Sequence, residues 1–120
     1  MPTGTGRRVL FVDDDELLDE FVEEQLAPMG YEITIADSVK AAGDLLASES
    51  FDAIALSPHL AEDKLDATVQ NWKTMDPFAR ILLVTNSPPH PRPPEVFRIL
   101  PRPLTLQDFH DAVVNPFAVV

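Results

Sequence analysis

Four apolar segments of this chain each stop at or just before a polar residue, and no other feature limits its fold as strongly. Residues 9–12 lead into Asp13 and Asp14, residues 51–56 into Ser57, residues 81–84 into Thr85, and residues 99–100 through one proline into Arg102. Helical patterns alternate with these segments, which is typical of βαβ units and predicts a parallel sheet. Because the carboxyl ends of parallel strands line one crevice, we expect these side chains to meet there.

Apolar residues recur at helical spacing between these strands. They predict helices over residues 15–27, after Ser38, along Leu65, Val69 and Trp72, and after Thr105. Residues 31–36 alternate in polarity and predict a fifth strand. Ser38 and Thr105 are expected to cap their helices, and Trp72 is interpreted as a core residue rather than a functional one.

The segment between the predicted fourth and fifth strands is too rich in proline for a helix. Residues 86–96 contain five prolines, which are Pro88, Pro89, Pro91, Pro93 and Pro94. Each proline inside a helix removes a hydrogen bond and crowds the preceding turn, at a cost of about 3 kcal/mol. We therefore predict an extended, polyproline-like strap over the edge of the sheet, with the usual crossover helix missing or reduced to a turn.

Length, charge and cysteine content limit the classes of function. The 120 residues predict one domain, residues 1–120, with a flexible tail over residues 1–6. A net charge of −11, with 9 Lys and Arg against 20 Asp and Glu, argues against binding to a nucleic-acid backbone. The chain has no cysteine and no apolar run of about 18 residues, so it predicts neither a thiol site nor a membrane span, and a cytoplasmic location is expected.

The strand-end residues resemble those of the receiver domain of bacterial two-component response regulators, and the resemblance covers nearly the whole chain. In that family an acidic pair follows the first strand, a phosphate-accepting Asp the third, a Thr or Ser the fourth, and Lys-Pro the fifth. The corresponding positions here are Asp13, Asp14, Ser57, Thr85, Arg102 and Pro103. The resemblance implies an α/β, doubly wound, flavodoxin-like fold with five parallel strands in the order 2-1-3-4-5.

Two of these positions depart from the family pattern. Ser57 stands in place of the acceptor Asp, and Arg102 stands in place of the Lys. A serine hydroxyl needs a general base before it can attack, so the usual phosphorylation is not expected. Because the pocket also loses a carboxylate, Mg²⁺ is expected to bind weakly, if at all, through Asp13, Asp14 and the backbone carbonyl of His59, and no cofactor is required.

Two side chains near this pocket have open alternatives. The guanidinium of Arg102 is always charged and suits bidentate pairing with a carboxylate. We expect it to lie across the pocket against Asp13 or Asp14; the alternative is that it turns to solvent. His59 has no His or Cys partner at metal-ligand spacing, and we interpret it as a loop histidine.

Two further expectations come from the resemblance alone. The peptide bond between Arg102 and Pro103 is expected to be cis, as in the Lys-Pro turn of the family. Ile99 occupies the position of the aromatic residue that couples to the conserved hydroxyl in receivers. The corresponding coupling to Thr85 is therefore expected to be missing.

The leading prediction is an atypical receiver domain, not an enzyme, that acts as a protein-interaction module without aspartyl phosphorylation. Its expected partners are a signalling protein or a histidine kinase, with a homodimer also possible, and the candidate surface is the five prolines of the strap together with Ile99. One alternative is a receiver phosphorylated at Ser57 or within the triple Asp. Another is a small phosphohydrolase-like protein that uses Asp13 and Asp14.

Overall fold

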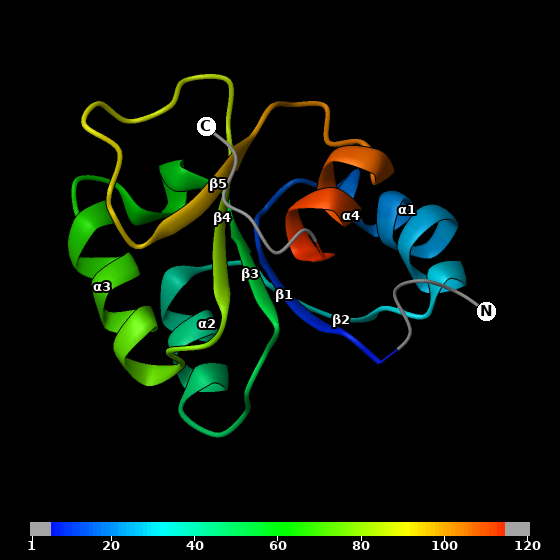
Figure 1. Ribbon diagram of the computed structural model, residues 1–120, viewed down its shortest axis with the longest axis horizontal. Helices are drawn as coiled ribbons and strands as arrows, with labels where there is room; N and C mark the ends of the chain where they lie inside the picture. Colours follow the sequence, from blue (N-terminus) through cyan, green and yellow to red (C-terminus); the bar gives the residue numbers. More distant parts are fainter. Residues whose placement is uncertain (1–5, 115–120) are drawn as a thin grey trace.

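A five-stranded parallel sheet forms the centre of the computed structural model, which describes residues 6–114 (Figure 1). Its strands are β1 (Arg8–Val12), β2 (Glu32–Ala36), β3 (Ala53–Leu56), β4 (Arg80–Val84) and β5 (Val96–Leu100). They lie in the order β2-β1-β3-β4-β5, and every pairing is parallel, which confirms the predicted order. All five strands therefore end at the same edge of the sheet.

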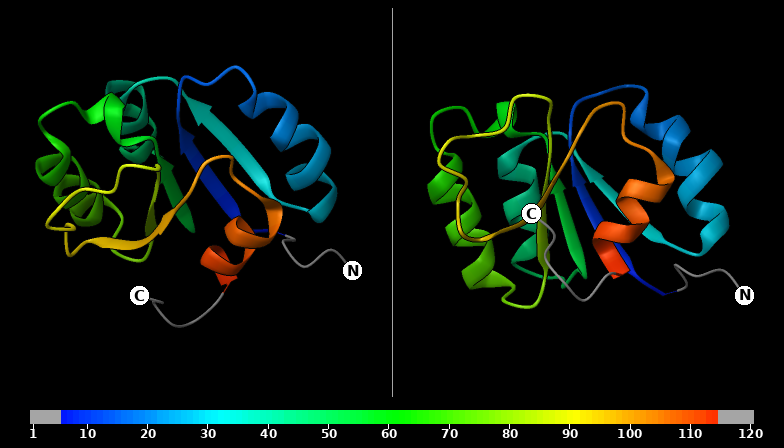
Figure 2. Two further views of the ribbon diagram at one scale, coloured as in Figure 1. Left: turned by 90° about the horizontal axis from the view of Figure 1, so that it is seen from above. Right: turned by 45° about the horizontal axis from the view of Figure 1, so that its top comes forward.

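Helices cover both faces of the sheet. They are α1 (Leu18–Phe21), α2 (Val39–Leu46), α3 (Leu65–Met75) and α4 (Leu106–Val114). Figures 1 and 2 show α2 and α3 on one face and α1 and α4 on the other. Successive residues of a strand point to opposite faces, so Leu10 packs in the core under α2 and α3, whereas Val9 and Phe11 pack in the core under α1 and α4.

The predicted caps and the predicted core tryptophan are confirmed. The Ser38 hydroxyl accepts a hydrogen bond from the Ala41 N–H at 3.1 Å, and the Thr105 hydroxyl accepts one from the Asp108 N–H at 3.2 Å. Each satisfies one backbone donor that a helix leaves free at its first turn. Trp72 is fully buried on the inner face of α3.

The prediction of a helix over residues 15–27 is wrong at its start, and the helical turns that reach Met29 are not a regular α-helix. The carboxylate of Asp15 accepts a hydrogen bond from the Leu17 N–H at 2.9 Å, a local turn that competes with helix, and α1 begins only at Leu18. After Phe21 the chain widens into a π-helical turn, in which the Ala27 N–H bonds to the Val22 carbonyl. Pro28 follows at once and has no N–H to continue an α-helix.

No helix lies between β4 and β5, as predicted, but the prediction of an extended, polyproline-like strap is wrong, because the backbone bends at residues 86–87 and 90–91 and turns at residues 94–95. Residues 86–95, the strap from here on, leave the carboxyl end of β4 and return beside α3 to the start of β5 (Figure 2). Arg92 fastens the strap to β5, because its guanidinium donates hydrogen bonds to the carbonyls of Val96 at 2.9 Å and Phe97 at 2.6 Å. Val96, which we predicted to belong to the strap, is the first residue of β5.

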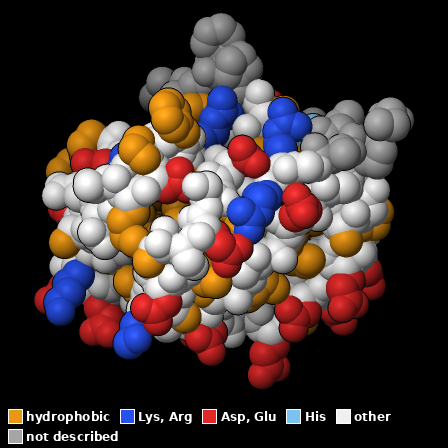
Figure 3. Space-filling view, turned by 90° about the horizontal axis from the view of Figure 1, so that it is seen from below, with side chains coloured by type: hydrophobic (Ala, Val, Ile, Leu, Met, Phe, Trp, Pro, Cys, Tyr) orange, Lys and Arg blue, Asp and Glu red, His pale blue; other side chains and the backbone are white. Residues whose placement is uncertain are grey.

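The surface reflects the acidic composition. Figure 3 shows one face of the molecule with red acidic side chains along much of its rim. None of the helices within residues 6–114 combines the length and the apolar character that crossing a bilayer requires. Residues 1–5 of the predicted tail lie outside the described residues, while the N–H of Gly6 bonds to the carbonyl of Gly30 at 3.1 Å.

Candidate functional site

The ends of β1, β3 and β5 bring three predicted site residues together. Asp13 directly follows β1 and its N–H bonds to the Ala36 carbonyl at 3.0 Å; Ser57 directly follows β3 and its N–H bonds to the Val12 carbonyl at 3.0 Å. The hydrogen bonding of the sheet thus extends into both residues and holds their backbones in place. Arg102 reaches the same point from the segment after β5.

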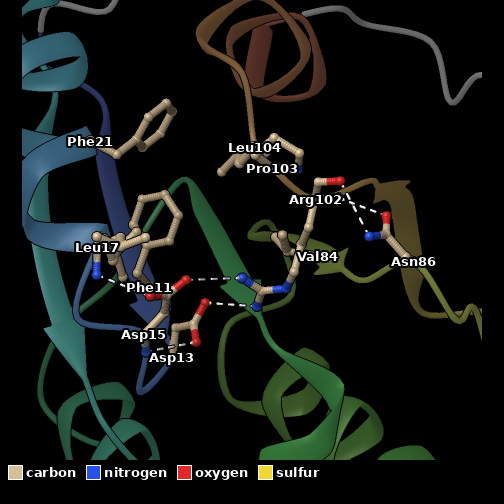
Figure 4. Close-up of a pocket in the computed structure, with 11 residues that line it drawn as sticks. Phe11, Asp13, Asp15, Leu17, Phe21, Val84, Asn86, Arg102, Pro103 and Leu104 are labelled. Atoms are coloured by element: carbon tan, nitrogen blue, oxygen red, sulfur yellow. Dashed lines mark hydrogen bonds and ion pairs between the residues drawn. The ribbon is translucent and has the colours of Figure 1, made fainter.

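The guanidinium of Arg102 lies inside the pocket. One of its nitrogens, Nη2, lies 2.9 Å from Asp13 Oδ2 and 2.7 Å from the Ser57 hydroxyl oxygen, and Nη1 lies 3.6 Å from Asp15 Oδ2. Figure 4 shows the guanidinium pointing toward the two carboxylates. The side chain of Asp13 is 7% exposed and that of Arg102 is 32% exposed, so the pair is largely screened from water. The predicted inward orientation is confirmed, with Asp13 and not Asp14 as the partner.

The backbone of Arg102 is held by Asn86, a residue that the sequence interpretation missed. The side-chain oxygen of Asn86 accepts the Arg102 N–H at 2.8 Å, and its side-chain nitrogen donates to the Arg102 carbonyl at 3.2 Å. The peptide bond between Arg102 and Pro103 is cis, as the resemblance implied. The sequence did contain a signal for this role, because Asn86 immediately follows Thr85, a predicted strand-end residue.

His59 joins Ser57 to Asp14, which the sequence interpretation also missed. Its ring nitrogen Nδ1 lies 2.8 Å from the Ser57 hydroxyl oxygen, and Nε2 lies 3.1 Å from Asp14 Oδ1. Pro58 starts a 3₁₀ turn (Pro58–Ala61) that brings the ring back over Ser57. The interpretation of His59 as a loop histidine was correct about its position in a turn. It missed the contacts of His59 with Ser57 and Asp14.

The protons in this network follow from the donors and acceptors present. Arg102 can only donate, so the Ser57 oxygen accepts from it and has its own hydrogen left to give to His59 Nδ1. In the neutral imidazole that this arrangement favours, Nδ1 is the acceptor and the Nε2–H donates to the carboxylate of Asp14. The result is a chain of hydrogen bonds that runs from a cation through a hydroxyl and an imidazole to a carboxylate.

Thr85 forms its hydrogen bonds beside the pocket. Its hydroxyl accepts the Ser87 N–H at 3.0 Å, and its own N–H donates to the Leu100 carbonyl at 2.8 Å. The hydroxyl therefore stabilises the start of the strap. Ile99, at the position of the family's aromatic residue, is half-buried and packs against the core under α2 and α3.

A cavity of about 390 Å³ opens beside the guanidinium (Figure 4). Its walls are mostly apolar side chains of α1 and of the segment after β5, among them Phe21, Pro103 and Leu104. Its polar lining consists of Asp13, Asp15, Asn86 and Arg102. Pro103, a predicted site residue, thus contributes a wall of this cavity and no polar group.

The side chains present do not fit a divalent metal ion. Asp13 Oδ2 is occupied by Arg102, Asp14 Oδ1 faces His59 Nε2, and the third strand end supplies the hydroxyl of Ser57. Among residues 6–114, no group of three or more His, Cys, Asp or Glu side chains is arranged to hold a metal. A hard cation such as Mg²⁺ needs several free oxygens around one point, and here a guanidinium takes that position.

The predicted partner surface needs one correction. Pro88, Pro91 and Pro94 are exposed and Pro89 is half-buried, but Pro93 is buried. The carbonyl of Pro93 accepts the N–H of the first residue of β5 at 3.1 Å, so Pro93 belongs to the turn that starts this strand. The strap therefore presents three exposed prolines, and Pro93 holds it to the body of the molecule.

No protein-family model matches the sequence, and no curated protein sequence matches it. Solved structures do match. A response regulator from Burkholderia pseudomallei, described with a phosphorylated aspartic acid, a calcium ion and citrate, superposes with a TM-score of 0.77 at 22% identity over 91% of this chain and 67% of that chain. The likeness extends over nearly all of the described sheet and helices.

Two smaller proteins give the same result. A chemotaxis response regulator from Vibrio cholerae superposes with a TM-score of 0.75 at 22% identity over 92% of this chain and 100% of that one. A response regulator receiver domain from Methanospirillum hungatei superposes with a TM-score of 0.75 at 18% identity over 88% of each chain. The chain therefore has the receiver fold that the sequence predicted.

Proposed function

We propose that this chain is an atypical receiver domain of bacterial signal transduction, which acts as a protein-interaction module without aspartyl phosphorylation. The observation that carries the proposal is the position of Arg102. Its guanidinium contacts Asp13 at 2.9 Å and Ser57 at 2.7 Å, so a resident cation lies beside the residue that replaces the acceptor Asp. A neutral hydroxyl and an internal cation replace the acceptor carboxylate and metal that receiver chemistry uses.

The pocket then holds the domain in one state without a cofactor. Arg102 links the ends of β1 and β3 through Asp13 and Ser57, and Asn86 holds the backbone of Arg102. A conformational change requires a ligand that favours one state over the other. In our proposal, Mg²⁺ is at most a weak ligand and the domain has no turnover of its own.

The strap is the proposed contact surface. It replaces a whole crossover helix, and its exposed prolines Pro88, Pro91 and Pro94 lie on a segment that Arg92 fastens to β5. A segment whose backbone is already restricted by five prolines and by Arg92 loses little conformational entropy when a partner binds it. Signalling proteins, histidine kinases among them, are the proposed partners, and a second copy of the chain is a further candidate. The excess of acidic side chains disfavours nucleic acid.

One observation favours a second candidate function. The contact of His59 with Ser57 places an imidazole where a general base for the hydroxyl would have to be. Phosphorylation at Ser57 is therefore the alternative with physical support.

The proposed function is tested by affinity capture with the chain as bait. The wild type, Ser57→Ala and a variant with the strap replaced by Gly and Ser are compared against one cell extract, and captured proteins are quantified by mass spectrometry. We expect Ser57→Ala to capture the same proteins as the wild type and the strap variant to lose them. If Ser57→Ala loses the partners while the strap variant keeps them, phosphorylation at Ser57 replaces this proposal.

A further inference from the structure

We propose that Ser57 is a metal-independent phosphoryl acceptor, with His59 as its general base, Asp14 as the residue that positions the base, and Arg102 as the cation that receives the phosphoryl oxygens. The inference goes beyond the proposed function: it takes the alternative of phosphorylation at Ser57 and names a covalent modification that would change the state of the same pocket. It rests on contacts among four side chains that come from three strand ends and one turn.

The first step is the contact between nucleophile and base. The Ser57 oxygen lies 2.8 Å from His59 Nδ1, within the range in which a hydroxyl proton can be transferred. Because Arg102 donates to the same oxygen, the hydroxyl hydrogen is directed toward the imidazole. A serine next to a base that is aligned in this way differs chemically from an isolated surface serine.

The second step is the orientation of the base. His59 Nε2 lies 3.1 Å from Asp14 Oδ1, so the imidazole carries its hydrogen on Nε2 and presents a lone pair at Nδ1. The carboxylate also stabilises the imidazolium that forms when Nδ1 takes the proton. Asp14 therefore acts through His59 and has no contact with the reacting oxygen.

The third step is the match between Arg102 and a phosphoryl group. The guanidinium lies 2.7 Å from the nucleophilic oxygen and can bind two phosphate oxygens at once with its planar array of donors. It offsets the repulsion between an anionic donor and the nearby carboxylates of Asp13, Asp14 and Asp15. No step of this kind requires a metal ion.

Burial limits the size of the donor. Ser57 is 2% exposed, whereas the side chains of His59 and Arg102 are 60% and 32% exposed. A donor reaches the hydroxyl past these two side chains, which favours a small phosphoramidate or acyl phosphate over a bulky substrate. Phosphoramidate carries three hydrogens on its nitrogen near neutral pH. The Ser57 oxygen forms a bond to phosphorus as the P–N bond breaks, and the electron pair of the P–N bond leaves with the nitrogen as neutral ammonia. The hydroxyl proton goes to His59 Nδ1 and then to water.

The product changes the charge of the pocket. A phosphoserine carries roughly −1.5 to −2 charges at neutral pH and offers three acceptor oxygens. Arg102 would then pair with the phosphate in preference to Asp13, so its link between the ends of β1 and β3 would be lost. Because phosphoserine is a stable ester and not a labile acyl phosphate, this state would persist until a phosphatase removed it.

The experiment incubates the full chain with phosphoramidate in the presence of a metal chelator. Intact mass measures the adduct, peptide mapping locates it, and hydroxylamine distinguishes an ester from an acyl phosphate. We expect one phosphate on Ser57, stable to hydroxylamine and absent in Ser57→Ala. His59→Ala should slow the reaction about 100-fold or more, the usual range for loss of a general base, and added imidazole should restore the rate. His110→Ala, which changes a histidine of α4 that bonds to Tyr31 outside the pocket and the strap, is the matched control and should react as the wild type does.

Several results would overturn the proposal. These are no adduct on the wild type, an adduct that hydroxylamine removes, an absolute requirement for Mg²⁺, or an unchanged rate in His59→Ala. A repeat with acetyl phosphate separates the donor classes, because an acetyl adduct in place of a phosphoryl adduct would show that the site takes acyl groups. The fluorescence of Trp72, the single tryptophan, checks that each variant is folded. If Ser57 is not phosphorylated, the affinity-capture test of the proposed function still stands, because binding of partners is proposed to depend on the strap.

Discussion

Arg102 Nη2 lies 2.9 Å from Asp13 Oδ2 and 2.7 Å from the Ser57 hydroxyl oxygen, so one guanidinium connects the segment after β5 to the ends of β1 and β3. The Asp13 side chain is almost fully buried, and Arg102 is its charged partner. Removing Arg102 would leave the charge of Asp13 with poor access to water. This relationship makes the pocket a structural element as well as a candidate site.

Replacing Arg102 with Met should destabilise the fold. A hydrogen bond to a charged group contributes about 1.5–3 kcal/mol, and we expect the lower half of that range because Arg102 is partly exposed. Urea unfolding followed by Trp72 fluorescence measures the loss. The double change Arg102→Met with Asp13→Asn is the control and should recover part of it, since the buried charge is gone. An unchanged free energy of unfolding in Arg102→Met would show that the contact contributes nothing to stability.

Magnesium should bind the wild type weakly. Titration followed by the amide shifts of Asp14 and Ser57 should not saturate at low millimolar concentration, because the guanidinium occupies the position of the cation. Ser57→Asp restores a third carboxylate and should tighten binding, and adding Arg102→Lys should tighten it further, because an ammonium lacks the planar array of donors that holds Asp13. Saturation of the wild type at low millimolar magnesium would contradict us.

Arg92→Ala should loosen the strap without unfolding the domain. The side chain holds the strap through the carbonyls of Val96 and Phe97, and these bonds disappear in the variant. Hydrogen exchange at the amides of Ser87 and His90 should become faster, and partner capture should weaken. Lys40→Ala, which removes an exposed ion pair with Asp44 on α2, is the control and should change neither. Equal exchange rates in both variants would show that Arg92 does not hold the strap.

Tyr31 should titrate above its ordinary range. Burial raises the pKa of Tyr31, while the charge of Arg7 acts in the opposite direction. Because Tyr31 is the only tyrosine in the chain, the phenolate absorbance reports it alone. Its titration midpoint should lie above about 10, the value of a free tyrosine.

The raised pKa of Tyr31 determines how the stability of the fold changes with pH. With a folded pKa above the unfolded one, the stabilisation from Tyr31 is fully present below about pH 10 and is lost as the pH rises through the folded value. Tyr31→Phe should lose the hydrogen bond to His110, at about 1 kcal/mol, and unfold with less dependence on alkaline pH. A tyrosine midpoint at or below that of the unfolded chain would refute this prediction.

The sequence predicted most of the fold because the relevant signals are local. The alternation of apolar runs with helical spacing determined the parallel sheet, and the proline content of residues 86–96 determined the missing crossover helix. Ser38 and Thr105 could be identified as caps because a cap needs only its own side chain and a donor three residues ahead. The predicted start of the first helix was wrong because a local turn at Asp15 competes with the apolar helical pattern.

The sequence by itself also determined which residues stand at the strand ends, since strand ends follow from the apolar pattern. Only the tertiary structure decided how their side chains pair. Arg102 and Asp13 are 89 positions apart, and His59 and Asp14 are 45 apart, so no periodicity relates them. Differences of a few tenths of an ångström decide which carboxylate pairs with the guanidinium of Arg102. They also decide whether the imidazole of His59 contacts the hydroxyl of Ser57. Those distances are set by sheet register and by the turn at Pro58, which exist only in the folded chain.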